Sequence, residues 1–312
     1  MMPRSARLAA GVCLAVVLAI TGCATGGTGG VPQSSGMQPV PTMGQTATPT
    51  SAPGSHITKV LVFVLENHSL EQMMQDLPYT FGVAKQYGYA THYTAITHPS
   101  LPNYLAISGG QTAGVTNDLD PSQVPIRGAS VFGQAISAGK TAGVYADAMK
   151  RNCETVNDGS YAVRHNPWTY YRAERANCQK YDVPLAALPA AISAGTLPNV
   201  GMVVPDTCND AHSCPLSTAD AWMKIWLPRV MAGPDWASGS LAIIVTADED
   251  YKNLPGNSVL TTVAFRGETP RIVSTPLTHY SLTRLYEDVA GVPHLANAAT
   301  APSLSKAFGF SP

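Results

Sequence analysis

Short, continuous apolar segments that are followed closely by carboxylates constrain the fold of this chain more than any other feature. Each is only four to eight residues long and mostly apolar, as is typical of strands buried on both faces of a parallel sheet. Amphipathic helices of this length would alternate apolar and polar faces instead. The segments occupy residues 59–65, 142–145, 199–204, 241–246 and 258–265.

Helical signals lie between these predicted strands. Ser69-Leu70-Glu71-Gln72 has the spacing of a capping box, and residues 280–289 form a run that stops at Gly291 and Pro293. Strands that alternate with helices predict an α/β sandwich around a mostly parallel central sheet. We expect a single domain over residues 56–312.

Acidic residues recur where the predicted strands end. Ligands of open α/β sheets bind in the crevice beyond the carboxyl ends of the strands, so we expect these acids to converge there. Clustered carboxylates repel one another unless cations or protons compensate, and a metal ion is the natural solution. The residues concerned are Glu66, Asp147, Asp206, Asp210, Asp248, Glu249 and Asp250.

Two histidines add to this pattern. His212 follows Asp210 by two residues, and His279 opens the last predicted helix. Mixed carboxylate and imidazole ligands suit hard or borderline ions better than metals that prefer thiolates. The sequence therefore predicts one or two divalent metal ions, with zinc, manganese, calcium or iron as candidates.

Ser100 lies in a segment that reaches a helix from a loop. Pro102 suits the first turn of that helix, and Gly109-Gly110 suits its end. A serine at a helix N-terminus serves as a cap in many proteins. Beside a metal ion, however, the pKa of the Ser100 hydroxyl falls and the serine becomes a nucleophile. Asn103, one turn later, can donate to a phosphoryl oxygen through its side-chain amide.

The N-terminus has the features of an export signal. Arg4 and Arg7 precede an apolar run over residues 8–20 that is too short to span a bilayer, and Thr21-Gly22-Cys23 follows. Residues 1–22 resemble a lipoprotein signal peptide, with Cys23 as the acylated first mature residue. The alternative is an ordinary cleaved signal with an incidental cysteine.

The next segment, residues 23–55, is rich in Gly, Ser, Thr and Pro, which predicts a flexible tether. Loss of residues 1–22 removes two arginines and no acids, which changes the net charge from −1 to 17 − 20 = −3. We therefore expect anchoring by lipid at the extracytoplasmic face of the membrane. The charge also gives no basic footprint for nucleic acid, and no obligate protein partner is evident.

Four further cysteines, Cys153, Cys178, Cys208 and Cys214, are expected to form disulfides in an oxidising compartment. Three connectivities can be drawn, of which the local pairing Cys153–Cys178 and Cys208–Cys214 is the simplest. A zinc site is the alternative, although the chain has no CxxC pair.

Six motifs in order carry a resemblance to a known family over residues 57–310. They are Glu66-Asn67-His68-Ser69, His98-Pro99-Ser100-x-Pro102-Asn103-Tyr104, His165-Asn166-Pro167-Trp168, Asn209-Asp210-x-His212, Asp248-Glu249-Asp250 and Thr278-His279-Tyr280. Together they resemble the bacterial phosphoesterase family within the alkaline phosphatase superfamily. That family includes non-haemolytic phospholipases C and secreted acid phosphatases, some of which act on phosphatidylinositol 3-phosphate. It implies an alkaline-phosphatase-like α/β/α sandwich.

The resemblance also implies roles for individual residues. It places Glu66, Ser100, Asp248 and Glu249 around one metal ion, with Ser100 as the nucleophile. It places Asp210, His212 and His279 in a second metal cluster. Asn67 and Asn103 would contact phosphoryl oxygens, and His165 would contact the substrate phosphate or the leaving group. The implied mechanism is a two-step, in-line displacement through a phosphoserine.

These features favour an exported, metal-dependent phosphomonoesterase. A phospholipase C-type phosphodiesterase is the first alternative, although the predicted domain is short for one. A non-catalytic ligand-binding lipoprotein is the second, but it gives no reason for Ser100 to lie among metal ligands. A sulfatase would need an arginine soon after its nucleophile, and Leu101-Pro102-Asn103-Tyr104 has none.

Overall fold

The computed structural model describes residues 56–251 and 256–312. The predicted signal peptide, Cys23 and the tether therefore lie outside the described residues. Within them, eight strands form one sheet in the order β5-β4-β6-β1-β7-β8-β2-β9. They are β1 Lys59–Leu65, β2 Gly88–Ala90, β4 Ala142–Ala146, β5 Asp182–Pro184, β6 Val200–Val204, β7 Leu241–Ala247, β8 Thr261–Phe265 and β9 Arg271–Val273. A separate parallel pair joins β3 (Tyr93–Thr94) to β10 (Leu277–Thr278).

The sheet is mostly parallel, as the sequence predicts. Strands β5, β4, β6, β1 and β7 all run in the same direction. Strand β8, within the predicted segment 258–265, is antiparallel to both β7 and β2. An apolar run looks the same in a parallel or an antiparallel buried strand, so the sequence pattern does not reveal this reversal.

Strand β1 lies at the centre of the parallel part. Val60 pairs with Val200 of β6 on one side and with Ala242 of β7 on the other. Six of its seven side chains are buried, because helices cover both faces of the sheet. Since β6, β1 and β7 are parallel neighbours, the loops that follow them begin at the same edge of the sheet.

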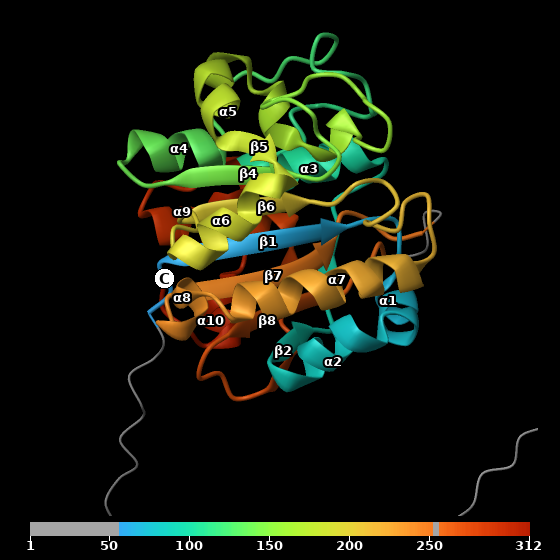
Figure 1. Cartoon of the computed structure of the whole chain (residues 1–312), viewed down its shortest axis with the longest axis vertical. Coiled ribbons are helices and arrows are strands. Elements are labelled where there is room, and N and C mark those ends of the chain that lie inside the picture. The colour runs from blue at the N-terminus through green and yellow to red at the C-terminus, as the bar shows by residue number, and fades with distance from the viewer. Residues whose placement is uncertain (1–55, 252–255) are drawn as a thin grey trace, which may run out of the picture. The chain divides into compact units, whose positions relative to one another are not determined.

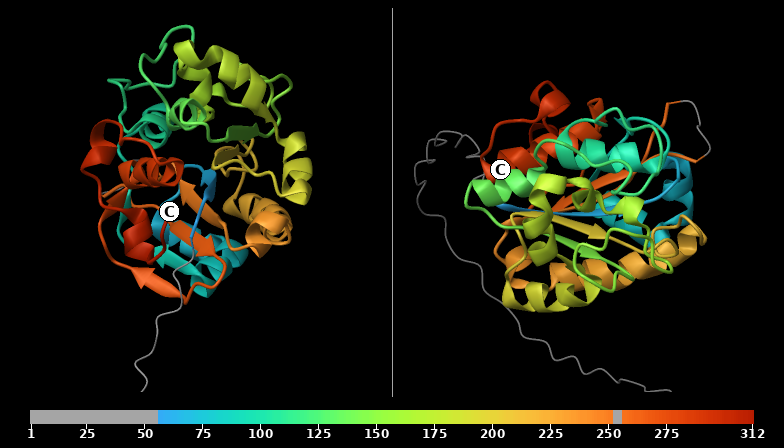
Figure 2. Two further views of the ribbon diagram at one scale, coloured as in Figure 1. Left: turned by 90° about the vertical axis from the view of Figure 1, so that its left-hand side faces the viewer. Right: turned by 90° about the horizontal axis from the view of Figure 1, so that it is seen from above.

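Helices form a layer on each face (Figures 1 and 2). Helices α3, α4 and α9 pack together on one face, and α1, α2, α6, α7 and α8 pack together on the other. The helix bounds are α1 Leu70–Asp76, α2 Pro78–Gln86, α3 Ser100–Gly109, α4 Val131–Ser137, α5 Arg175–Tyr181, α6 Leu188–Ala194, α7 Leu216–Met231, α8 Pro234–Ala237, α9 His279–Ala290 and α10 Leu304–Phe308. This arrangement confirms the α/β/α sandwich.

The predicted helix signals are also confirmed. Ser69 caps α1 with the expected capping box, in which its side chain accepts from the backbone N–H of Gln72. Helix α9 begins at a second capping box on Thr278 and ends at Gly291, which adopts a left-handed conformation. No helix in the described part of the chain is both long and apolar enough to cross a membrane.

Both disulfides follow the local pairing. Cys153 is bonded to Cys178 of α5, and Cys208 to Cys214. The second bridge closes the loop that follows β6, which carries Asp210 and His212. The zinc alternative for these cysteines finds no support, since all four sulfurs are in disulfides.

We expect the native protein to contain no free thiol at these four positions. Each bridge should stabilise the fold by about 2–4 kcal/mol, because it restricts the unfolded chain. Alkylation under native, non-reducing conditions followed by peptide mapping would check this. Modification of two or more of the four cysteines would contradict the pairing.

Candidate active site

The three central strands bring the predicted site residues together through backbone contacts. The Glu66 N–H after β1 donates to the carbonyl of Asp210 in the loop after β6, at 2.9 Å. The Asp248 N–H after β7 donates to the carbonyl of Leu65, at 3.0 Å. These two backbone hydrogen bonds hold Glu66, Asp210 and Asp248 next to one another, although the three residues are far apart in the sequence.

Glu66 and Ser100 form the contact at the centre of this site. Ser100 is the first residue of α3 and is almost fully buried, and its Oγ donates to Glu66 Oε2 at 3.2 Å. The same oxygen accepts from Asn67 Nδ2 at 3.0 Å. Asn67 has a φ of 53°, a left-handed conformation that asparagine tolerates better than most residues. The turn at Asn67 thus aims its amide back at the carboxylate beside Ser100.

His165 lies between two buried carboxylates. Its Nε2 is 3.0 Å from Glu66 Oε1, and its Nδ1 is 3.1 Å from Asp210 Oδ2. These contacts are close, but none of the four atoms makes a well-aligned hydrogen bond. The ring of His165 stacks on Tyr104 of α3, with centroids 5.2 Å apart. Three potential ligand atoms of Glu66, His165 and Asp210 lie within 4.8 Å of one another.

Asp248 and Glu249 close the site on the β7 side. Asp248 Oδ1 accepts from the backbone N–H groups of Asn67 and Glu249, at 3.2 and 2.7 Å. Its second oxygen, Oδ2, is buried and has no hydrogen-bond partner. Glu249 Oε2 accepts from Asn103 Nδ2 at 3.1 Å.

His279 contacts Asp248 rather than Asp210. Its Nε2 donates to the Asp248 carbonyl at 2.6 Å, and its Nδ1 accepts from the Tyr93 hydroxyl at 3.1 Å. Burial lowers the pKa of His279 to about 4. In this arrangement Nε2 holds the segment that carries Asp248 and Nδ1 holds Tyr93 of β3, so metal binding by His279 would replace one of these bonds.

His212 faces the outer side of the site. Its Nε2 lies 3.0 Å from Arg164 Nη2, and because a guanidinium can only donate, the imidazole nitrogen accepts. The backbone N–H of His212 donates to Asp210 Oδ1 at 2.7 Å. The structure therefore joins Asp210 to His212 through the backbone and to Glu66 through His165.

Asn103 organises the loop before Ser100. Its Oδ1 accepts from the backbone N–H groups of Ile96 and Thr97, and its Nδ2 donates to the Thr97 carbonyl at 2.7 Å. A contact between this amide and a phosphoryl oxygen would replace one of its existing bonds.

Two other strand-end acids bind loop residues instead. Asp147 accepts from Asn209 Nδ2 in the loop after β6, at 2.9 Å, and so links two loops. Asp206 accepts from the backbone N–H groups of Cys208 and Asn209, as turn residues do.

The charges of the site are not balanced by its own side chains. Burial alone would raise the pKa of Glu66, but the charge of His165 outweighs it and lowers that pKa to about 2. Burial alone would lower the pKa of His165, but Glu66 and Asp210 raise it to about 9. Burial, followed by repulsion from Glu66, raises the pKa of Asp248 well above its usual value and that of Glu249 to about 9. One imidazolium thus faces four carboxyl groups.

These residues fit a divalent metal ion. The donors are carboxylate oxygens and imidazole nitrogens, which suit zinc, manganese or iron. Three of the carboxylate oxygens are buried and have no hydrogen-bond partner, namely Glu66 Oε1, Asp210 Oδ2 and Asp248 Oδ2. Buried polar atoms left in this state are costly and rare in native proteins, and a bound cation would satisfy them.

Sequence reasoning missed three polar residues around this centre. His98 lies 3.1 Å from Glu249 through Nδ1, Asp118 accepts from the Leu101 N–H at 2.9 Å, and Arg164 lies 3.8 Å from Asp118. His98 belongs to a motif noted above, without an assigned role. Asp118 and Arg164 lie in irregular segments with no periodic signal. They connect the start of α3 to His212.

A cavity of about 410 Å³ opens over this centre. It is within the range of small-molecule sites. Its lining includes the proposed site residues Asn67, His212 and Glu249 as well as His68 and His98. A substrate can therefore approach Ser100 between the loops that follow β1, β6 and β7.

Comparisons with solved structures agree with this fold. A protein in the alkaline phosphatase superfamily from Vibrio parahaemolyticus matches with a TM-score of 0.57 and 12% identity, over 82% of this chain and 73% of that one. The lipoteichoic acid synthase LtaP from Listeria monocytogenes matches with a TM-score of 0.54 and 8% identity, over 80% and 77%. At these identities the likeness establishes an alkaline-phosphatase-like fold and no more.

The family follows from the sequence. The chain belongs to the Phosphoesterase family, whose model matches residues 63–251, and it is a hydrolase of phosphoric ester bonds. It is 28% identical over 257 residues to a phosphatidylinositol-3-phosphatase from Mycobacterium tuberculosis, a match that covers 80% of this chain and 82% of that protein. It is 27% identical over 222 residues to an acid phosphatase from Aspergillus fumigatus, which covers 66% of this chain and 48% of that protein. The chain thus spans about half of this fungal relative.

Proposed function

We propose that this protein is an exported, metal-dependent acid phosphatase that hydrolyses phosphate monoesters through a phosphoserine at Ser100. The observation that carries the proposal is the contact of Ser100 Oγ with Glu66 inside a buried cluster of carboxylates and one imidazole. A helix-capping serine has no need of these neighbours. A nucleophilic serine does, because its alcohol must lose a proton.

Residues Glu66, Asp210, Asp248 and Glu249 would hold one or two divalent ions, next to the protonated His165. His212 and His279 could join them after giving up a present hydrogen bond. Such an ion supplies positive charge that favours the alkoxide of Ser100 and the negative charge of a transferring phosphoryl group.

The residues of the chain perform the remaining tasks. Ser100 attacks phosphorus in line with the leaving alcohol, and water then hydrolyses the phosphoserine from the opposite side. The Asn67 amide, which lines the cavity, donates to a phosphoryl oxygen. His165, held between Glu66 and Asp210, keeps a proton beside the reacting group. Asn103 and His279 position the loops that carry Ser100 and Asp248.

Two observations support a monoester substrate. A monoester dianion needs more positive charge around it than a diester does, and Arg164 contacts His212, which lines the cavity. The relative from Mycobacterium tuberculosis is named as a phosphatidylinositol-3-phosphatase. We therefore propose phosphoinositides such as phosphatidylinositol 3-phosphate as candidate substrates.

Parallel assays with p-nitrophenyl phosphate and bis-p-nitrophenyl phosphate, with and without a chelator, test this proposal. We expect faster turnover of the monoester and loss of activity on chelation. A preference for the diester would favour the phospholipase C-type alternative. Equal activity before and after complete metal removal would contradict metal dependence, and no hydrolysis of either ester would favour a ligand-binding protein.

The export and lipid anchor are part of the same proposal. We expect Cys23→Ser to release the protein from the membrane fraction or to block processing, with turnover of the purified domain unchanged, because the predicted tether separates Cys23 from the predicted domain. Membrane fractionation and mass spectrometry of the N-terminal peptide would check this. A wild-type protein without lipid at Cys23 would show that the lipoprotein assignment is wrong.

A further inference from the structure

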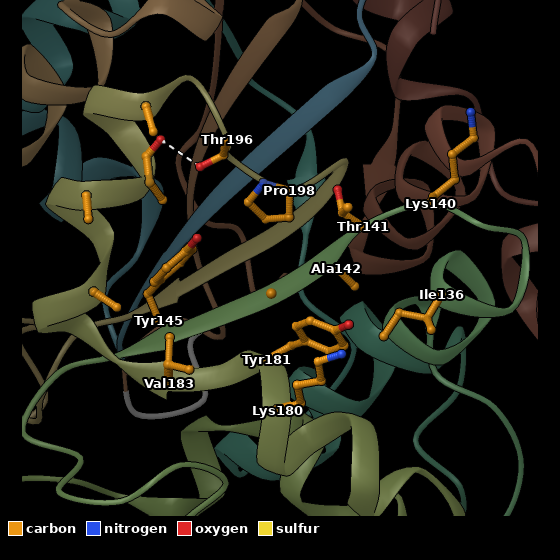
Figure 3. A pocket seen from close by; sticks show the side chains of 15 residues that line it. Ile136, Lys140, Thr141, Ala142, Tyr145, Lys180, Tyr181, Val183, Thr196 and Pro198 are labelled. Atoms are coloured by element: carbon orange, nitrogen blue, oxygen red, sulfur yellow. Dashed lines mark hydrogen bonds between the residues drawn. The ribbon is translucent and has the colours of Figure 1, made fainter.

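A second cavity, of about 540 Å³, lies away from the proposed catalytic residues (Figure 3). It reaches residues just before the amino ends of β4 and β6, at Thr141 and Pro198. The catalytic cluster lies beyond the carboxyl ends of β1, β6 and β7. None of the residues that line this cavity belongs to that cluster.

The wall of the cavity is largely apolar. Helix α6 packs Leu188 and Ile192 into the core and turns its alanines toward the cavity. Ala190 and Ala194 of this helix are exposed, as is Ala187 just before it. Their small side chains leave open the space between α6 and β4, where Tyr145 and Tyr181 contribute ring surface (Figure 3). Covering such apolar surface with an apolar ligand is favourable, because it removes the surface from water.

The charge around the cavity is positive. Among its fifteen lining residues are Lys140 and Lys180 and no acid. Both lysines are exposed, and neither forms an ion pair with another residue in the described part of the chain. Lys180 Nζ lies 4.9 Å from the centroid of the Tyr181 ring, at the cavity (Figure 3). Lys140 points away from Tyr181, so Lys180 is the cation nearest the apolar wall (Figure 3). An apolar wall with a cation at one end complements a ligand that is apolar along its length and anionic at one end.

We propose that this cavity binds an anionic amphiphile with a single alkyl chain, such as a fatty acid. The chain would lie between α6 and β4, and the acidic group would lie beside Lys180, next to Tyr181 (Figure 3). This site is separate from the phosphoesterase centre and does not depend on the function proposed for it.

Calorimetric titration of the full protein with octanoate, nonanoate and decanoate tests the proposal. Each added methylene should tighten binding about fourfold until the cavity is filled, which corresponds to about 0.8 kcal/mol per buried CH₂. Octanoate should bind more tightly than 1-octanol, and Lys180→Gln should abolish that difference. Equal affinity for the acid and the alcohol in the wild type would overturn the anionic part of the proposal.

A pair of substitutions on α6 locates the binding. Ala190→Trp should fill the cavity and lower affinity for decanoate at least tenfold, whereas Ser193→Trp on the same helix, outside the cavity, should leave it unchanged. Both variants should hydrolyse p-nitrophenyl phosphate like the wild type. Decanoate binding that survives Ala190→Trp, or that competes with p-nitrophenyl phosphate, would place the ligand elsewhere and overturn the site.

Discussion

The Ser100→Ala variant is expected to lose about three to six orders of magnitude in kcat toward a phosphate monoester. The substitution removes the only group proposed to form a bond to phosphorus, while Glu66 and His165 remain. Residual turnover would come from the remaining electrostatic site. Stopped assays at saturating substrate and metal would measure the loss, and circular dichroism would confirm that the variant is folded.

Ser108→Ala provides a matched control for this variant. Ser108 lies on the same helix, is equally buried, and its hydroxyl contacts Tyr171 rather than the site. We expect at most a modest loss of stability and near-normal kcat. Near-wild-type turnover in Ser100→Ala would instead leave direct attack by water as the mechanism.

The Asp248→Asn variant is expected to lose activity for a different reason, namely weaker metal binding. The substitution replaces the Asp248 carboxylate, whose Oδ2 is buried and has no hydrogen-bond partner, by a neutral amide. Partners of metal ligands already change metal affinity about 10–100-fold when mutated, so a direct ligand should cost at least tenfold. Metal content after dialysis, measured by mass spectrometry, would show the loss, and excess metal should restore part of the activity. Ser100→Ala should not respond to added metal.

Asp147→Asn is the control for Asp248→Asn. Asp147 also follows a parallel strand, but its carboxylate binds Asn209 and the Ala148 N–H. We expect normal metal content and normal turnover. If Asp147→Asn lost metal as Asp248→Asn does, the effect would reflect general damage to this edge of the sheet rather than loss of a ligand.

Much of the fold is predictable from local signals. The apolar runs locate β1, β4, β6 and β7 to within a residue or two, because burial on both faces allows only apolar side chains. Strands β2, β5 and β9 have three residues each, too few for a periodic pattern. Their positions depend on neighbours far away in the chain.

The site is predictable in part, for a related reason. The rule that an acid just after a predicted strand belongs to the site selects Glu66, Asp210 and Asp248. It also selects Asp147 and Asp206, which bind loop residues instead. Strand order, a property of the whole sheet, separates Asp147 from the site, because β4 lies one strand further from β1 than β6 does. Asp206 and Asp210 both follow β6, and only the hydrogen bonds made within that loop separate them. The contact of His165 with both Glu66 and Asp210 depends on that order as well.

The order of strands in the sheet also determines at what stage of folding the catalytic cluster can assemble. β1 comes first in the chain, yet its neighbours in the sheet begin at Val200 and Leu241, and His279 follows later still. Contacts of such high sequence separation are slow to form during folding. No contiguous fragment short of residues 66–279 contains all the proposed groups. A chain interrupted before α9 would therefore contain Ser100 and yet lack His279, which orients Asp248. The return of hydrolysis during refolding would therefore show that the strands and α9 have all assembled.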